Sequence, residues 1–176
     1  MVKPKPEQKI KLEQLRSIVL DLMQDMEIWS EIDTDELEKI DLGVLRINAT
    51  QRHGVTRWKK GVDVSNLTPC DVQEINIHPD LLEERWNAYA AFVLHHEYIH
   101  ALGFREHDKR FRYLEKSWPG SKAVKHGSEF TEFLRMKNAK WIWSCRTCNK
   151  EFPRKKPSKG MYKCRECNTV LIDNKI

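Results

Sequence analysis

The chain has 176 residues, of which 40% are hydrophobic and 32% charged, so it can bury one core of ordinary size and carry a small further module. No run of about 18 apolar residues is present, and we therefore expect neither a transmembrane helix nor a membrane partner. Residues 1–7 lack the apolar centre of a secretory signal, which favours a short lead into a helix and a cytoplasmic location.

The formal net charge of +5 is unevenly distributed along the chain. Residues 145–176 contain nine Lys or Arg against three Asp or Glu, a net charge of +6, and the rest of the chain sums to −1. The positive charge therefore belongs to the C-terminal segment and not to the larger part of the chain that precedes it.

The first half of the chain predicts helices followed by a small sheet. Residues 7–30 carry apolar residues near helical spacing, and a short helix is expected whose first turn is the acidic stretch at residues 33–36. Three candidate strands follow, at residues 44–48, 56–60 and 72–78, and the first two could pair across a turn. We therefore expect an α+β fold in which a small antiparallel sheet packs with helices. An exposed edge of such a sheet can accept an extended peptide as an additional strand.

The most informative stretch is the H-E-x-x-H motif from His96 to His100, at the end of a helix predicted over residues 81–102. Residues four apart lie one above the other on a helix, so His96 and His100 can hold one Zn²⁺ between them. Glu97 then lies beside the metal, where it can take a proton from bound water. The simpler alternative is that both histidines merely lie on a partly exposed helix.

A third ligand is expected shortly after this helix. Gly103 suits a left-handed turn that would bring His107 back within reach of the metal. Three protein ligands with one open position are typical of a catalytic zinc site, whereas a structural site is closed by a fourth ligand. Further helices are expected over residues 108–116, directly after His107, and over residues 127–138.

The C-terminal segment contains four cysteines as two C-x-x-C pairs, Cys145 with Cys148 and Cys164 with Cys167. Their separation of fifteen residues fits a structural zinc site with four thiolate ligands, the core of a zinc ribbon. A redox function of a C-x-x-C pair is the alternative, but no βαβ pattern surrounds either pair. We therefore expect two domains, at residues 1–140 and 141–176.

Lysines, arginines and two aromatic residues lie between the two cysteine pairs. Such a loop could bind a phosphate backbone and stack on bases, so DNA is an expected partner. The alternative is a solvated hairpin whose rings pack on the small core of the ribbon. The residues concerned are Lys150, Phe152, Arg154, Lys155, Lys156, Lys159, Tyr162 and Lys163.

Taken together, residues 40–176 resemble the SprT-like (Spartan-type) zinc metalloproteases. The resemblance rests on the strand ending in residues 74–79, the H-E-x-x-H helix, a later His followed four residues on by an aromatic residue, and the C-terminal ribbon. It implies a zinc endopeptidase with one catalytic and one structural zinc, acting on proteins that are bound or crosslinked to DNA.

Two histidines match the third-ligand pattern of that family, in which an aromatic residue follows the His after three residues. His107 precedes Phe111, and His126 precedes Phe130. We expect His107 to be the ligand, because it needs only the turn at Gly103, whereas His126 requires a long excursion through Pro119. The choice between the two histidines is left open by the sequence.

Three rival interpretations remain. The protein could be a zinc peptidase that acts on free proteins without nucleic acid, or a zinc-ribbon protein that binds nucleic acid and has no catalytic activity. Glu97 argues against the second, because a structural site does not need a general base. A metzincin is the third, since Gly103 has the position of the glycine in that motif, but His107 comes one residue late.

Overall fold

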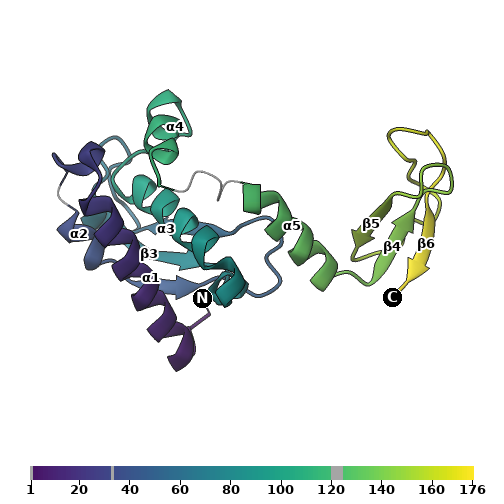
Figure 1. The fold of residues 1–176 in the computed structure, drawn as a ribbon, viewed down its shortest axis with the longest axis horizontal. Coiled ribbons are helices and arrows are strands. Elements are labelled where there is room, and N and C mark those ends of the chain that lie inside the picture. Colours follow the sequence, from purple (N-terminus) through teal and green to yellow (C-terminus); the bar gives the residue numbers. More distant parts are fainter. Residues whose placement is uncertain (1, 33, 120–124) are drawn as a thin grey trace. The chain divides into compact units, whose positions relative to one another are not determined.

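Apolar residues at helical spacing form two long helices in the first part of the chain. The structure is a computed structural model that describes residues 2–32, 34–119 and 125–176, and it divides into two units, Met1–His126 and Gly127–Ile176 (Figure 1). Helix α1 (Pro6–Gln24) buries Leu12, Val19 and Met23 almost completely. Helix α3 (Asn87–Ala101) is buried at eleven of its positions, which makes it the centre of the first unit.

Both long helices are shorter than the sequence predicts. The helix expected over residues 7–30 ends at Gln24 and is followed by a 3₁₀ turn at Glu27–Trp29. The helix expected over residues 81–102 begins only at Asn87, because residues 79–86 form two 3₁₀ turns. The first of these turns starts at Pro79, whose fixed φ suits a turn, and the His78 ring accepts a hydrogen bond from the Asp80 N–H.

A mixed sheet of three strands forms the second layer of this unit. Strands β1 (Leu42–Val44), β3 (Val72–Ile77) and β2 (Gly54–Trp58) lie in the order β1-β3-β2. β2 pairs with β3 antiparallel, but β1 pairs with β3 in parallel. The prediction of an antiparallel sheet is therefore wrong for β1, and so is the prediction that the first two strands pair with each other.

The length of the link between β1 and β2 explains this error. The nine residues from 45 to 53 can reach roughly 30 Å, and strands on either side of a third lie only about 10 Å apart. The link therefore carries the chain past β3 to its other side. The N–H of Leu45 donates to the carbonyl of Ile77 over 3.0 Å, which keeps the start of the link beside β3.

The two long helices cover one face of this sheet. α1 and α3 lie side by side, with α1 against β1 and α3 against β2 and β3 (Figure 1). β3 contributes Ile75 and Ile77, both fully buried, to the core. Helices α2 (Asp35–Glu38) and α4 (Lys109–Lys116) complete the unit, and α4 begins one residue after the start of its predicted range. This arrangement places the end of α3 beside β2.

The second unit combines a helix with a small antiparallel sheet. α5 (His126–Lys137), whose first residue is the last residue of the first unit, lies close to its predicted range. Strands β5 (Glu151–Arg154), β4 (Trp141–Ser144) and β6 (Ile172–Lys175) follow in the sheet order β5-β4-β6, with both pairs antiparallel. The predicted domain boundary between residues 140 and 141 falls at the start of β4, whereas the two compact units divide between His126 and Gly127, so α5 belongs with the C-terminal sheet. Within the part of the chain that the structure describes, no helix is long and apolar enough to span a membrane.

Candidate metal centre

Three histidine side chains converge at the end of α3. The Nε2 atom of His107 lies 3.2 Å from Nε2 of His96 and 3.1 Å from Nε2 of His100. An ion bound at about 2.0–2.1 Å from each nitrogen would hold two nitrogens roughly 3.3 Å apart in tetrahedral geometry. The spacing therefore fits the donor set of a single metal ion, and these three residues form a group that could hold one.

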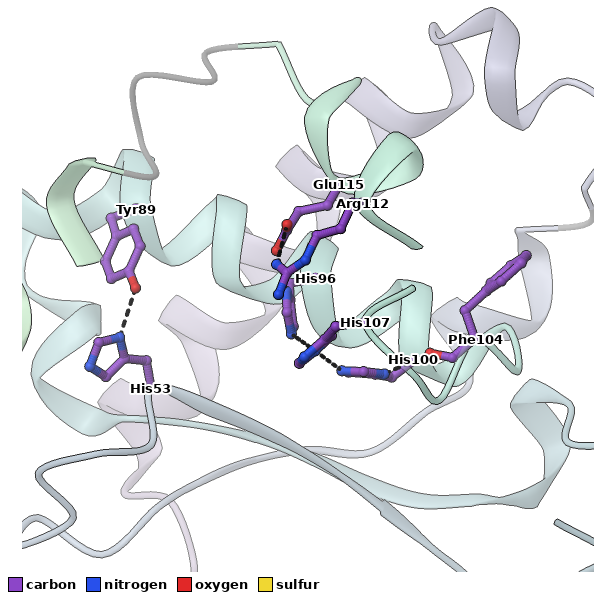
Figure 2. A network of polar contacts seen from close by, with 8 residues as sticks. All are labelled: His53, Tyr89, His96, His100, Phe104, His107, Arg112 and Glu115. Atoms are coloured by element: carbon purple, nitrogen blue, oxygen red, sulfur yellow. Dashed lines mark hydrogen bonds and ion pairs between the residues drawn. The ribbon is translucent and has the colours of Figure 1, made fainter. Parts of the chain in front are cut away.

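The opposite ring nitrogens of two of these histidines are already engaged. Nδ1 of His96 lies 2.7 Å from a carboxylate oxygen of Glu115, and Nδ1 of His100 lies 2.8 Å from the carbonyl oxygen of Phe104 (Figure 2). Both partners are acceptors, so each Nδ1 must carry the proton. The Nε2 atoms of His96 and His100 then present lone pairs toward His107, as metal ligands do.

The turn after α3 brings His107 into this cluster. Gly103 adopts φ +94°, as predicted, and a side chain there would meet the carbonyl oxygen of Leu67 at 2.6 Å. The chain then runs back to Asp108, whose carboxylate accepts a hydrogen bond of 2.8 Å from the N–H of Phe111 and caps α4. His107 is therefore held between a glycine turn and a helix cap, one residue before the cap of α4.

Phe111 lies beneath all three imidazoles. Its ring is fully buried, and its centroid lies 4.9 Å from His96, 4.7 Å from His100 and 4.6 Å from His107. An aromatic ring four residues after the third His therefore excludes solvent from one side of the cluster. This contact gives a physical reason for the His-x-x-x-Phe spacing seen in the sequence.

His126 lies elsewhere in the first unit. Its ring is 6.5 Å from that of Trp86, the residue directly before α3. Trp86 and His100 are separated by most of the length of α3, about 20 Å at 1.5 Å per residue. Of the two candidates for the third ligand, the structure thus brings His107 together with His96 and His100.

Glu97 is buried beside the histidine cluster and is held by strand β2. The hydroxyl of Thr56 lies 2.8 Å from Oε2 of Glu97 and 3.0 Å from its backbone oxygen. Burial raises the pKa of the Glu97 carboxyl, and the neighbouring His96 and the hydrogen bonds from Thr56 oppose this effect. A side chain at Gly54 would lie 2.6 Å from Oε1 of Glu97, so glycine is what allows β2 to approach this close.

The cluster opens into a cleft of about 460 Å³ along β2. Glu97 is the only carboxylate among its lining residues, and Arg52 and Arg105 are exposed at its border. A larger cavity, of about 610 Å³, lies between α1 and α3 and contains none of the predicted site residues. The cleft is lined by Arg52, Gly54, Val55, Thr56, Trp58, His96, Glu97, His100, Arg105 and His107.

The four cysteines of the second unit also converge. The Sγ atoms of Cys148 and Cys164 lie 3.7 Å apart, and a tetrahedral zinc site with Zn–S bonds of about 2.3 Å requires about 3.8 Å. The backbone N–H of Cys148 helps to lower the pKa of the Cys145 thiol to about 6, whereas neighbouring thiols raise that of Cys167 to about 12. Thiolates gathered this closely repel one another unless a cation lies between them, and the group could hold a metal ion.

The two cysteine turns have the same local structure. In the first, Asn149 has φ 56° and its N–H donates to the carbonyl of Cys145 over 2.9 Å. In the second, Asn168 has φ 53° and its N–H donates to the carbonyl of Cys164, also over 2.9 Å. A residue in the left-handed region closes each turn, and Asn tolerates that conformation better than most residues.

The aromatic residues between the cysteine pairs pack partly on the small core of residues 141–176, the segment predicted to be the ribbon. Tyr162 stacks on Trp143 with centroids 4.7 Å apart, and the Arg154 guanidinium lies 5.0 Å from the Trp143 ring and 5.7 Å from that of Phe152. These contacts favour rings packed on the core of the ribbon. Tyr162 nevertheless remains half exposed, and Lys155, Lys156, Lys159 and Lys163 are exposed as well.

Sequence reasoning missed the residues that orient the site. Glu115 follows Phe111 by four residues and so shares its face of α4, a signal that could have indicated a role at the metal. No sequence signal links Thr56 to Glu97, because the two are 41 residues apart.

A comparison of the chain with protein-family models, curated proteins and solved structures found no match.

Proposed function

We propose that this protein is a zinc-dependent endopeptidase of the SprT-like type. The observation that carries the proposal is the convergence of three imidazole nitrogens, from His96, His100 and His107, next to the buried carboxylate of Glu97. Three neutral nitrogen ligands and an open position on the cleft side suit Zn²⁺ in a hydrolytic site better than they suit Mg²⁺ or Ca²⁺, which prefer oxygen ligands.

Glu97 would act as the general acid–base. When bound, a zinc ion supplies Lewis-acid chemistry: it polarises a carbonyl and lowers the pKa of a water to about 7. The Glu97 carboxylate takes the proton of the attacking water as its oxygen adds to the scissile carbonyl. The same carboxyl then passes that proton to the leaving amine as the C–N bond breaks. Thr56 keeps Oε2 of Glu97 in place through both transfers.

In the part of the chain that the structure describes, β2 is an edge strand of its sheet, and this outer edge supports the proposal of an extended peptide substrate. The N–H of His78 donates to the carbonyl of His53, so these two residues form a hydrogen-bonded pair at the start of the β2–β3 ladder. In an antiparallel ladder such pairs alternate with pairs whose backbone N–H and C=O groups point away from the partner strand. The N–H and C=O of Gly54 and Thr56 therefore point to the edge. Ile75 lies opposite Thr56, and its N–H donates to the carbonyl of Asp41, on the β1 side, and not to β2. This agrees with a register in which Thr56 and Ile75 do not bond to each other.

Such an edge would bind the backbone of a substrate peptide and would not recognise its side chains. An added strand bonds to main-chain groups, which every peptide has, and the edge runs directly past Glu97. We therefore propose a substrate that is locally extended or unfolded, cut with little dependence on side chains. An endopeptidase fits this edge because it runs along the cleft.

We further propose that the substrates are proteins bound or crosslinked to DNA, recruited through the ribbon. The supporting observations are the net charge of +6 on residues 145–176, the exposed lysines and the half-exposed ring of Tyr162. A ribbon with zinc bound by reduced thiolates suits a reducing compartment, so the proposed location is the cytoplasm. The second candidate is a zinc peptidase acting on free proteins, which the internal packing of Trp143 and Phe152 favours.

Two assays test these proposals. The purified chain should contain two equivalents of zinc and should cleave itself or an unfolded protein, whereas Glu97→Gln should keep the zinc and lose cleavage. A Glu97→Gln variant with normal activity would overturn the assigned role and the proposal with it. Adding single-stranded DNA then separates the two candidates, because only a DNA-dependent enzyme is stimulated by it.

A further inference from the structure

We propose that Glu115 is a positioning residue that fixes the tautomer and orientation of His96 and ties α4 to the metal centre. The inference rests on the histidine cluster of the proposed function but not on peptidase activity. It concerns how tightly the cluster binds a metal ion, and it can be tested in a protein that cleaves nothing.

Both oxygens of the Glu115 carboxylate have a partner. One lies 2.7 Å from Nδ1 of His96, and the other accepts a hydrogen bond of 2.7 Å from Nη1 of Arg112 (Figure 2). The side chain of Glu115 is only 12% exposed, so it is held in place and shielded from water. An ionised, hydrogen-bonded carboxylate at Nδ1 keeps the proton there and leaves Nε2 as the donor to a metal.

Among the described residues, His96 is the one member of the histidine cluster whose Nδ1 contacts a side chain, which a substitution can remove. His100 obtains the same orientation from the backbone carbonyl of Phe104, which a substitution does not remove. The Glu115 carboxylate also places negative charge behind the ring of His96, which makes the imidazole a stronger electron donor. Loss of Glu115 should therefore weaken metal binding through His96 while leaving the other two rings in position.

The same carboxylate links a helix to the metal. Glu115 and Phe111 lie four residues apart on the face of α4 that contacts His96. His107 lies directly before the residue that caps α4, so this short helix carries one metal ligand at its start and the orienting group of another near its end. A bound ion would thus join both ends of α4 to α3, and metal removal should loosen α4 more than α1.

The test measures metal affinity in the full chain. The four cysteines of the second unit could also hold a metal ion, so Co²⁺ is the probe. Thiolate ligation gives charge-transfer bands, whereas ligation by three histidines gives only weak visible bands. Competition with a chelator then yields the affinity of the histidine site. Glu115→Ala and Glu115→Gln are compared with Glu106→Gln, which removes a charge beside His107 from an exposed position.

We expect Glu115→Ala to weaken the histidine site about 10- to 100-fold. Glu115→Gln should fall between it and the wild type, because an amide oxygen can still accept from Nδ1 but carries no charge. Glu106→Gln should stay within about twofold, since only the specific contact is proposed to matter. An unchanged affinity in Glu115→Ala, or an equal loss in Glu106→Gln, would overturn the proposal.

Two further readouts keep this inference separate from others. If Glu115 merely stabilised the fold, Glu115→Gln would lower the melting temperature of the metal-free protein but leave the Co²⁺ affinity of the folded histidine site unchanged. We expect that affinity to fall. Hydrogen exchange in residues 109–116 should slow when metal is added to the wild type and should slow less in Glu115→Ala. If the wild type binds two metals and cleaves no protein, the peptidase proposal fails, but the role of Glu115 stands.

Discussion

The hydroxyl of Thr56 lies 2.8 Å from the carboxylate of Glu97, and a single residue of the edge strand thereby holds the proposed general base. Replacing Thr56 with Val removes this hydrogen bond without changing the shape of the side chain much. We expect kcat/KM to fall about 10- to 100-fold, less than the roughly 10²–10⁴-fold that general acid–base catalysis contributes, because Glu97 itself remains. Zinc content should not change, because Thr56 contacts no ligand ring.

The control for this prediction is Thr56→Ser, which keeps the hydroxyl. Activity should be largely retained in that variant and reduced as stated in Thr56→Val, measured on the same unfolded substrate at saturating zinc. Equal activity of the two variants would show that the hydroxyl does not position Glu97.

Gly54 is predicted to be intolerant of any side chain. A Cβ atom at this position would lie 2.6 Å from Oε1 of Glu97 and 2.8 Å from Cγ1 of Val93, closer than real Cβ contacts come. In Gly54→Ala the strand or the carboxylate must move, so we expect kcat to fall at least tenfold while zinc stays bound. Val55→Ala, the neighbouring substitution that adds no atoms, is the control. Wild-type turnover in Gly54→Ala would show that the close approach of β2 is not needed.

The proposed binding of a substrate along the edge of β2 depends on main-chain groups. Thr56→Pro removes an N–H that points away from β3, and an edge strand tolerates proline there. We expect this variant to bind zinc and to show no turnover. Thr56→Ala loses the same hydroxyl but keeps the N–H. The difference in activity between Thr56→Ala and Thr56→Pro therefore measures the contribution of the backbone contact. Equal activities would refute binding at this edge.

Local patterns predicted α4 and the convergence of the three histidines, because the signals for both lie close together in the sequence. His96 and His100 are one helical turn apart, and the turn at Gly103 spans only seven residues from His100 to His107. The parallel pairing of β1 with β3 joins Leu42 to Ile75, and no periodicity reports such a distant contact. Glu115 is nineteen residues from its partner His96, so the orienting contacts of the site required the folded chain.

The ribbon is expected to depend on its metal for folding. Its buried core consists of Trp143, Cys145, Cys164 and Leu171, and two of these are proposed ligands. So small a core contributes little apolar burial, so we expect a metal ion bound by the four cysteines to supply much of the folding free energy. Chelation at neutral pH should therefore abolish protection from hydrogen exchange in residues 141–176 while α1 and α3 stay protected. Cys164→Ser should reproduce this loss without a chelator, and a ribbon that stays protected in both would contradict the prediction.

We expect the buried ring of His53 to make the free energy of unfolding decrease in mild acid. Burial of the ring, together with the nearby His78, lowers the pKa of His53 to about 4, and its Nδ1 atom lies 2.7 Å from the Tyr89 hydroxyl (Figure 2). The unfolded chain takes up a proton near pH 6.5 and the folded one does so only near pH 4. The stability contributed by the neutral ring is therefore complete above pH 6.5 and is lost as the pH falls toward 4. In His53→Gln, the free energy of unfolding, measured by urea titration, should change less with pH between 6.5 and 4 than in the wild type. An unchanged dependence on pH would exclude His53 as a source of the acid sensitivity.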